Sequence, residues 1–323
     1  TIASGAANVY LVFTAICSLW ENAMRILISG ASGLIGAHLA GLLNERGHDV
    51  VRLVRRSVQN PSTEIFWHPE SGEIDRSAIA SSRFDAAVHL AGRSIASLWT
   101  ARHKRLVRSS RIDSGRLLAS TLAALKTPPS TYISMSATGY YGNRGDEILV
   151  ESSAVGTGFM ANLCRDWEAS ADPLREAGVR VVHPRMGIVL SQKGGFLAPL
   201  LPFFRLGLGA RIGDRRQWLS WIHVDDAVAA LLLMLDRPEI HGPVNVTSPN
   251  PVTMGEFTET LACLLHRSAP FSVPAALLKL LPGSMGEEMF LTSQRVHSGV
   301  LQESGFPFTF ERLKAALEDV LLS

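Results

Sequence analysis

Residues 24–36, Met-Arg-Ile-Leu-Ile-Ser-Gly-Ala-Ser-Gly-Leu-Ile-Gly, decide how this sequence folds. The continuous apolar run at 26–28 is typical of a strand buried on both faces of a parallel sheet. Gly30 permits a tight turn, Gly33 lets the main chain approach a pyrophosphate, and Gly36 allows the next helix to pack closely on the strand. We therefore expect a strand, a turn and a helix whose first amides face an anion.

The residues after this turn complete a strand–helix–strand unit. Apolar side chains recur on one face of the helix, and residues 49–54, Asp-Val-Val-Arg-Leu-Val, form a second buried strand. A glycine triplet alone also suits a tight turn without a ligand, but this setting favours a dinucleotide. The residues expected to contact it from the turn are Gly30, Ser32, Gly33, Leu34, Ile35 and Gly36.

Arg55 and Arg56 stand at the end of the second strand, where an acidic residue would accept the ribose hydroxyls of NAD. Guanidinium groups suit a 2′-phosphate instead, so the pair favours NADP as the cofactor. The alternative is a solvated strand end that binds no ligand.

Composition and charge describe a globular protein with an ample core. The 323 residues carry 31 basic and 29 acidic side chains, a net charge of +2, and 46% are hydrophobic. This balance gives no reason to expect nucleic acid or an anionic membrane as a partner. Cys17, Cys164 and Cys263 lie far apart, which argues against a disulfide framework and favours a reducing compartment, the cytoplasm.

Residues 1–23 differ from the rest of the chain. Residues 9–19 are apolar but too short to span a bilayer, and no basic residue precedes them as in a secretory signal. Because Met24 stands directly before the first strand, we interpret residues 1–23 as an extension outside the fold. A short packing helix or a membrane-associated segment is the alternative.

A further strand is expected to end at the same ligand-binding edge of the sheet. Residues 84–92 run from a buried strand into small side chains, which let a flat cofactor lie against the strand end. Leu90, Ala91 and Gly92 are therefore predicted to contact the cofactor. His89, inside this strand, is interpreted as a packed core residue.

A long basic helix is expected over residues 99–126. Most of its basic side chains indicate a solvated face, whereas Arg111 is predicted to reach the cofactor phosphates. Residues 132–135 and 179–190 form two more strands. This alternation predicts an α/β fold, a doubly wound parallel sheet of the Rossmann type.

The pattern changes beyond residue 190, where glycine-punctuated and then mostly helical sequence begins. We divide the chain into a Rossmann domain at 24–190, which also receives about 222–247, and a smaller substrate-facing region at 191–323.

Trp218, Trp221 and His223 are candidates to line a substrate cleft, and core packing is the alternative role for the tryptophans. The His223-x-Asp225 spacing invites a metal site, but no further cluster of ligands accompanies it in the sequence. We therefore expect no metal, and interpret Asp225 as the N-cap of a helix.

These residues resemble an extended short-chain dehydrogenase/reductase, the superfamily of sugar-nucleotide epimerases and dehydratases. The chain is most similar to its atypical epimerase-family group, whose members end in a small C-terminal domain of unknown function. The motifs that carry the resemblance are Gly30-Ala-Ser-Gly-Leu-Ile-Gly36, His89-Leu-Ala-Gly92, Ser136-Ala-Thr-Gly-Tyr-Tyr-Gly142, Phe203-Phe-Arg-Leu-Gly-Leu-Gly209, Trp221-Ile-His-Val-Asp-Asp226, Asn245-Val-Thr-Ser-Pro-Asn250 and Ser293-Gln-Arg-Val296. The resemblance implies a seven-stranded Rossmann sheet with NADP across its carboxyl edge, and a substrate site built largely from the last third of the chain.

The resemblance also exposes a departure in the catalytic residues. Superfamily members combine a serine, matched here by Ser136, with a Tyr-x-x-x-Lys pair whose lysine lowers the pKa of the tyrosine. The corresponding helix reads Gly-Phe-Met-Ala-Asn-Leu-Cys over 158–164 and lacks both residues. Tyr140 or Tyr141 is a candidate phenol, and Arg185 a candidate to polarise a carbonyl or bind an anion. Loop packing and a structural ion pair are the respective alternatives.

Two functions remain open from the sequence. One is an NADP-dependent oxidoreductase or epimerase-like enzyme that acts on a small molecule, a sugar nucleotide or carbonyl compound, with a homodimer as the candidate assembly. The other is a catalytically inactive NADP-binding regulatory or interaction protein that kept the fold.

Overall fold

The centre of the molecule is a twisted, mostly parallel sheet. The computed structural model describes residues 23–322, so the extension expected at residues 1–23 lies, apart from Ala23, outside the described residues. The main strands are β1 (Arg25–Ser29), β2 (Asp49–Val54), β3 (Glu64–His68), β4 (Glu73–Ile74), β5 (Ala86–His89), β6 (Thr131–Ser134), β9 (Arg180–Met186) and β14 (Gly242–Val246). Their order is β14-β9-β6-β5-β1-β2-β3-β4, and every pair is parallel except β3–β4.

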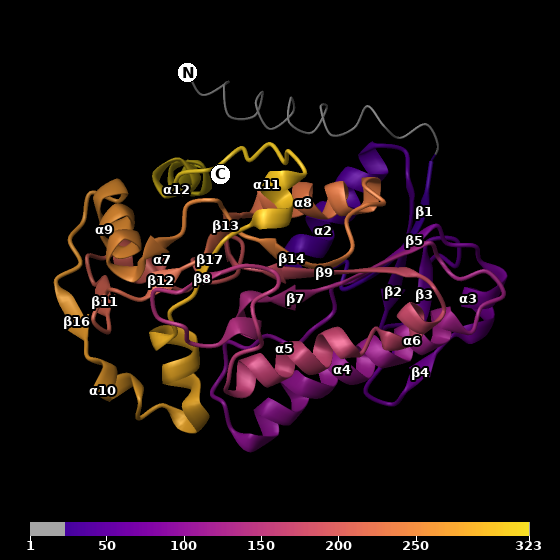
Figure 1. The fold of residues 1–323 in the computed structure, drawn as a ribbon, viewed down its shortest axis with the longest axis horizontal. Helices are drawn as coiled ribbons and strands as arrows, with labels where there is room; N and C mark the ends of the chain where they lie inside the picture. The colour runs from indigo at the N-terminus through magenta and orange to yellow at the C-terminus, as the bar shows by residue number, and fades with distance from the viewer. Residues whose placement is uncertain (1–22, 323) are drawn as a thin grey trace.

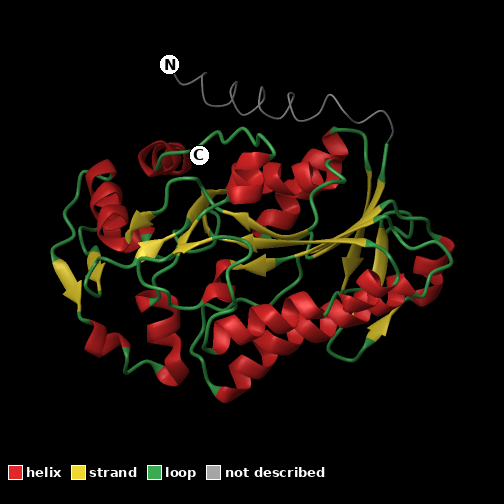
Figure 2. Ribbon diagram, in the orientation of Figure 1, coloured by secondary structure: helices red, strands yellow, loops and turns green. Residues whose placement is uncertain are grey.

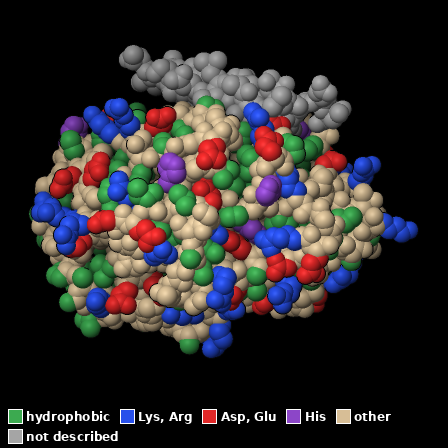
Figure 3. All heavy atoms as spheres, viewed as in Figure 1, with side chains coloured by type: hydrophobic (Ala, Val, Ile, Leu, Met, Phe, Trp, Pro, Cys, Tyr) green, Lys and Arg blue, Asp and Glu red, His purple; other side chains and the backbone are tan. Residues whose placement is uncertain are grey.

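Helices cover both faces of this sheet, which confirms the predicted doubly wound α/β fold (Figures 1 and 2). One face carries α2 (Leu34–Glu45), α8 (Val224–Asp236) and α11 (Gly299–Glu303). The other carries α3 (Arg76–Ser81), α4 (Ala101–Ala123), α5 (Phe159–Ala169) and α6 (Asp172–Glu176). Basic and acidic side chains are interspersed over the face drawn in Figure 3.

The apolar run in β1 has a direct structural reason. Ile26 and Ile28 face the core between the sheet and helices α2 and α8, whereas Leu27 faces the core on the α4 side. All three side chains are fully buried. A strand with helices on both faces needs apolar residues at every position, and β1 has them.

The chain leaves the sheet after β9 and returns to it through α8 and β14, which pairs with β9. The short strand β7 (Ser136–Ala137) also belongs to the main sheet, where it pairs in parallel with β9. The elements outside the main sheet are η1 (Thr138–Tyr141), β8 (Ile148–Leu149), β10 (Ile188–Leu190), α7 (Leu201–Arg205), β11 (Ala210–Ile212), β12 (Trp218–Leu219), β13 (Trp221–His223), β15 (Val252–Thr253), α9 (Met254–Leu264), β16 (Phe271–Val273), α10 (Ala275–Leu278), η2 (Pro282–Ser284), η3 (Glu287–Leu291), β17 (Arg295–Val296) and α12 (Leu313–Leu322). Side chains from α7, α9 and α12 form a second core around Trp221.

Two predicted helix boundaries need correction. Helix α4 begins after Thr100, whose hydroxyl accepts the His103 amide at 3.1 Å, rather than at Trp99. The N-cap of α8 is His223 and not Asp225, because the His223 ring accepts the Asp225 amide at 3.2 Å.

Among the described residues, no helix is both long and apolar enough to cross a membrane.

Candidate functional site

The glycine turn between β1 and α2 is dictated by close backbone packing. Gly30 has φ +74°, and a Cβ atom there would lie 2.8 Å from the Ala91 nitrogen. A methyl group on Gly36 would overlap the Gly30 carbonyl oxygen. The Gly33 amide donates to that same oxygen at 3.0 Å, which closes the turn. Two of the three glycines are therefore required by the backbone itself.

The start of α2 offers an anion-binding site. Its N-cap is Gly33, and no side chain caps the helix. The first amides of a helix have no partner within the helix, so those of Leu34, Ile35 and Gly36 can bind a ligand. Ser32 and Gly33 are exposed, which leaves the approach open. These residues fit a dinucleotide diphosphate, the group predicted for this turn.

The arginine pair after β2 is divided between two roles. Arg56 forms a forked ion pair with Glu64, with N–O distances of 2.6 and 3.0 Å. Glu64 also accepts the Gln59 amide at 2.9 Å, and hydrogen bonds from Arg56 and Gln59 lower its pKa to about 2. Arg55 is exposed. The Glu64 carboxylate thus organises the loop after β2 and leaves Arg55 directed to solvent.

The strand end at Leu90–Gly92 lies directly against the glycine turn. The Leu90 amide donates to the Ser29 carbonyl at 3.1 Å, so this loop and the turn share one edge of the sheet. His89 is fully buried between Ser29 and Ser114, with its nitrogens 2.7 and 3.3 Å from their hydroxyls. Burial lowers the pKa of His89 to about 4. This confirms its interpretation as a neutral core residue.

Arg111 supports the same loop from behind. Its guanidinium donates to the Arg93 carbonyl at 2.8 Å and lies 5.0 Å from the Trp167 ring centroid. A Cβ atom on Gly92 would lie 3.2 Å from Arg111 Cζ. The glycine at 92 therefore makes room for this guanidinium under the loop.

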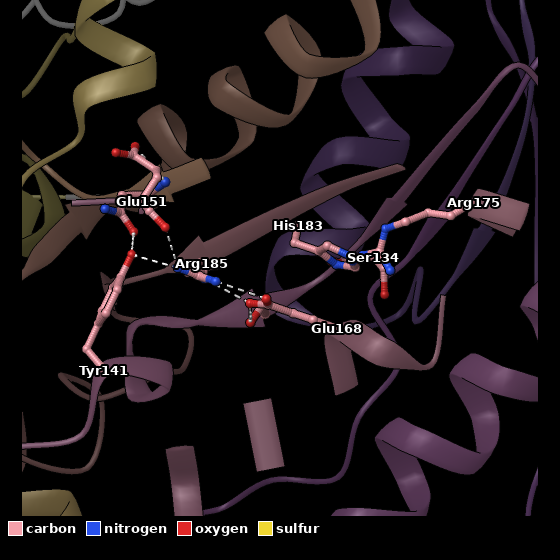
Figure 4. Close-up of polar contacts among 9 residues, drawn as sticks. Ser134, Tyr141, Glu151, Glu168, Arg175, His183 and Arg185 are labelled. Atoms are coloured by element: carbon pink, nitrogen blue, oxygen red, sulfur yellow. Dashed lines mark hydrogen bonds and ion pairs between the residues drawn. The ribbon is translucent and has the colours of Figure 1, made fainter. Parts of the chain in front are cut away.

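Ser136, Glu168 and Arg185 form a buried polar network at the end of β6 and β9. Figure 4 shows Glu168 and Arg185 facing one another within it. The Ser136 hydroxyl donates to Glu168 at 2.7 Å. Arg185 donates to both Glu168 oxygens, at 2.9 and 3.0 Å, and to the Glu151 carbonyl at 3.0 Å. Its side chain is only 4% exposed. Arg185 thus closes an internal ion pair, and its charge is balanced within the protein.

The two candidate tyrosines differ in their environment. The Tyr141 hydroxyl donates to Asn245 Oδ1 at 2.6 Å and accepts from Arg185 at 3.0 Å. Burial raises the pKa of Tyr141 to about 12, although Arg185 and Asn245 act in the opposite direction. Tyr140 is half-buried, and its ring centroid lies 3.5 Å from Arg185 Cζ. Tyr141 is therefore committed to the core, whereas Tyr140 is partly accessible.

His183 lies two residues before Arg185 on β9 and is also buried (Figure 4). His183 Nδ1 is 3.2 Å from the Ser134 carbonyl, and Arg175 contacts the other ring nitrogen. Burial lowers the pKa of His183 to about 4. This histidine is a neutral structural residue.

Helix α5 presents a thioether and a thiol to the turn that contains Tyr140. A Cβ atom on Gly139 would lie 3.3 Å from Met160 Cε and 3.7 Å from Cys164 Sγ. Burial raises the pKa of Cys164 to about 12, so the thiol stays protonated near neutral pH. Neither side chain can perform the proton transfer of a tyrosine–lysine pair.

The structure buries two of the three predicted cleft residues. Trp221 and His223 are 0% and 2% exposed, and Trp221 packs in the second core. Trp218 is half-buried; its indole donates to Asp146 at 2.8 Å, and the Arg295 guanidinium lies 4.4 Å from its ring. Of the three, Trp218 alone has a substantially accessible side chain.

His223 has more acidic neighbours than its sequence motif indicates. Its Nε2 lies 3.3 Å from an Asp319 oxygen, and its Nδ1 accepts the Asp225 amide. His223, Asp225 and Asp319 thus form a cluster of potential ligands, so the premise that no third ligand accompanies the motif is wrong. The lone pair of Nδ1 already accepts the Asp225 amide, which leaves Nε2 as the ring nitrogen beside Asp319.

Sequence reasoning missed three residues that organise the site. Glu64 begins a strand, Glu168 lies in the helix that lacks the expected pair, and Asn245 lies in a quoted motif without an assigned role. Glu168 was detectable in principle, because a polar residue eight positions after Met160 continues the same helix face. Glu64 offers no comparable signal.

Comparisons with known proteins agree with this architecture. Residues 26–162 match the NAD dependent epimerase/dehydratase family, and residues 273–320 match a domain of unknown function, DUF1731. An epimerase family protein of Mycobacterium bovis is 41% identical over 293 residues, which are 90% of this chain and 96% of that protein.

Two solved structures are similar over nearly the whole chain. Human epimerase family protein SDR39U1, crystallised with NADPH, has a TM-score of 0.82 and 31% identity, covering 93% of this chain and 100% of that one. A nucleoside-diphosphate sugar epimerase from Corynebacterium glutamicum has a TM-score of 0.80 and 31% identity over 97% of this chain, which spans 62% of that protein. This chain therefore belongs to the NAD dependent epimerase/dehydratase family, as an atypical extended short-chain dehydrogenase/reductase with a C-terminal DUF1731 domain.

Proposed function

We propose that this protein binds NADP and acts as an oxidoreductase or epimerase-like enzyme on a small molecule with a hydroxyl or carbonyl group. The observation that carries this proposal is the uncapped start of α2 behind the glycine turn, with exposed Arg55 at the end of the neighbouring strand. The first binds a diphosphate and the second suits a 2′-phosphate. The human relative crystallised with NADPH supports the same choice.

The chemistry is assigned to the turn that follows β6. A bound nicotinamide supplies hydride transfer, and the protein must then hold a proton donor or acceptor beside the substrate. Tyr140 is our candidate for this proton donor or acceptor, since its side chain is only half-buried. The Tyr141 hydroxyl already donates its hydrogen bond to Asn245. Because the Ser136 hydroxyl donates its proton to Glu168, its lone pairs are the part available to a substrate hydroxyl.

A second function is favoured by a specific observation. Met160 and Cys164 face the turn where an active relative of the superfamily has a proton relay, and the charge of Arg185 is balanced by Glu168. These features suit a cofactor-binding regulatory or interaction protein that performs no turnover.

Turnover measurements separate the two functions. Purified protein is incubated with NADP or NADPH and a panel of sugar nucleotides and small carbonyl compounds. Cofactor absorbance is followed, and sugar nucleotides are also analysed for epimerised product, because an epimerase returns the hydride and leaves the cofactor unchanged overall. The enzyme proposal predicts net cofactor conversion or epimerised product, at a rate that Tyr140→Phe reduces at least about 100-fold, the scale of general acid–base catalysis. Tyr141→Phe serves as the neighbouring comparison. Tight NADPH binding with no turnover on any compound would favour the regulatory function instead.

A further inference from the structure

Helix α5 lacks a cap of its own. Its N-cap is Gly158, which has φ +101° and no side chain that could accept the first amides of the helix. Such amides need an acceptor, because they have no partner within the helix. The acceptor therefore comes from elsewhere in the chain.

Glu288, in η3, supplies the missing cap. Its two carboxylate oxygens accept the Phe159 amide at 3.1 Å and the Met160 amide at 2.8 Å. The Ser284 hydroxyl donates to the same carboxylate at 2.6 Å and is 3.3 Å from Lys104 Nζ. A negative charge at a helix N-terminus is favourable, so this contact fastens η3 to α5.

The glycine at 158 is matched to this contact. A Cβ atom there would lie 2.9 Å from a Glu288 carboxylate oxygen, so any side chain would push the carboxylate away. The positive φ of Gly158 also disfavours other residues. Helix start and carboxylate thus fit one another from positions 130 residues apart.

The chain around Glu288 buries few side chains. Its other polar contacts include the Gln217 side chain, which donates to the Phe290 carbonyl at 3.2 Å, and the exposed Lys279–Glu287 ion pair. Of residues 275–291, which include α10 and lie beside the N-terminal end of α5 (Figure 1), only Met285 and Gly286 are buried. None of these residues belongs to the hydrophobic cores among residues 23–322. Leu277 and Leu280 are 56% and 79% exposed. Segments with few buried apolar contacts open at low free energy, ahead of the rest of the fold.

The C-terminal end of the segment adjoins the reaction turn. Met160, whose amide Glu288 binds, also packs on Gly139. Immediately after the segment, the Ser293 amide donates to Asn143 at 3.0 Å and the Gln294 side chain donates to the Gly142 carbonyl at 3.1 Å. Glu288 therefore holds the segment close to the point where the chain is fixed beside the turn, whereas the other end of the segment follows β16, which pairs with β11.

We propose that residues 275–291 form a lid over the N-terminal end of α5, latched by the Glu288 carboxylate, which opens as a unit when this carboxylate leaves the Phe159 and Met160 amides. The lid controls access to the Ser136–Tyr141 turn. The role of the lid in substrate access rests on the proposed function. The latch itself is a property of the fold and does not depend on that function.

Hydrogen exchange measured by mass spectrometry tests the latch on the full chain. In Glu288→Gln, peptides covering 275–291 and 158–162 should exchange at least about tenfold faster than in the wild type, and β1 and β6 should be unchanged. The matched control is Glu287→Gln, because Glu287 is exposed and in the same turn. It should alter exchange less than about twofold. Gly158→Ala, which crowds the carboxylate, should reproduce the pattern of Glu288→Gln.

Two results would overturn the lid. Equal exchange in Glu288→Gln and Glu287→Gln would show that the carboxylate fastens nothing. Faster exchange that spreads to β1 and β6 would show a cap of the whole fold rather than a lid. NADPH affinity, measured in parallel, should be unchanged in Glu288→Gln. If the wild-type protein binds no NADPH while Glu288→Gln still shows faster exchange only at 275–291 and 158–162, the proposed function is contradicted and the lid stands.

Discussion

Arg185 shows how one side chain can be taken for a catalyst. It lies at the end of a strand beside Ser136, where the sequence predicts either a substrate contact or an ion pair. Its guanidinium donates to both Glu168 oxygens, to the Glu151 carbonyl and to the Tyr141 hydroxyl. The sequence could place Arg185 at this edge of the sheet, because the end of a buried strand can be predicted from its apolar pattern. It could not reveal the partners, because they come from three other segments.

The energetic role of this ion pair can be measured. Arg185→Met leaves the Glu168 carboxylate buried without its partner, which should reduce the free energy of unfolding by about 3–5 kcal/mol. Replacing both partners, Arg185→Met with Glu168→Leu, should be less harmful than the single change. The control is the exposed pair Arg108–Asp166, where Arg108→Met should cost no more than about 1 kcal/mol. Urea unfolding of these variants and of the Glu168→Leu single variant completes the cycle. A double variant whose loss equals the sum of the two single losses would contradict the account.

The cofactor arginines make a prediction at the same scale. Replacing Arg55 and Arg56 together by alanine should weaken NADP binding by about tenfold or more, because charge-assisted contacts to the 2′-phosphate are lost. NAD binding should change little. Because Arg56 is held by Glu64, Arg55→Ala alone should produce most of the loss. Calorimetry with both dinucleotides measures the difference, and equal losses for the two would show that the arginines do not read the phosphate.

At the scale of elements, the strands and helices of the Rossmann part follow from local sequence. The apolar run of β1, the glycine turn and the period of α2 can all be predicted, because local burial and backbone geometry determine the residue types at these positions. Helix α5 was readable too, but its cap was not. Gly158 marks where the helix starts, whereas the acceptor for its amides lies in η3, and tertiary capping leaves no local signal.

Two glycines in α2 separate a packing requirement from a helix preference. Gly36→Ala should unfold the protein or reduce its stability by several kcal/mol, because the methyl group overlaps the Gly30 carbonyl. Gly41→Ala should stabilise it by up to about 1 kcal/mol, since a Cβ atom there meets no atom within 4 Å and alanine favours the helix. Thermal unfolding of both variants provides the comparison. If Gly36→Ala and Gly41→Ala unfold at similar temperatures, the contact between residue 36 and the Gly30 carbonyl does not limit stability.

For the whole molecule, a seven-stranded Rossmann sheet was implied by family resemblance, and the path of the chain beyond residue 190 was predicted only in outline. The C-terminal region combines short strands and helices whose pairings join distant segments, such as β8 with β17 and β12 with β15. Short strands carry too few residues to show a period. Trp221 and His223 are buried by this long-range packing, and the local sequence around them does not reveal that burial.

Buried histidines give the molecule a pH-dependent stability. In the folded protein, burial lowers the pKa of His89 and His183 from 6.5 to about 4. Above pH 6.5 neither state binds the proton; below it the unfolded chain does and the folded protein does not, so stability falls as pH drops towards 4. Each histidine should remove about 2 kcal/mol between pH 7 and pH 5. Urea unfolding at both pH values measures this loss.

The exposed His241 provides the control for this dependence. His241→Gln should show the same loss of stability between the two pH values as the wild type. A wild-type free energy of unfolding that stays constant from pH 7 to pH 5 would mean that these rings are hydrated in the folded protein.

The most direct measurement is calorimetric titration of the folded, full-length protein with NADPH and, separately, with NADH. Amides at the start of α2 should bind the diphosphate of either carrier, and Arg55 should add affinity for the 2′-phosphate, so the account predicts saturable binding with NADPH at least about tenfold tighter. Absence of binding by both carriers would contradict the central claim that this strand–turn–helix holds a dinucleotide.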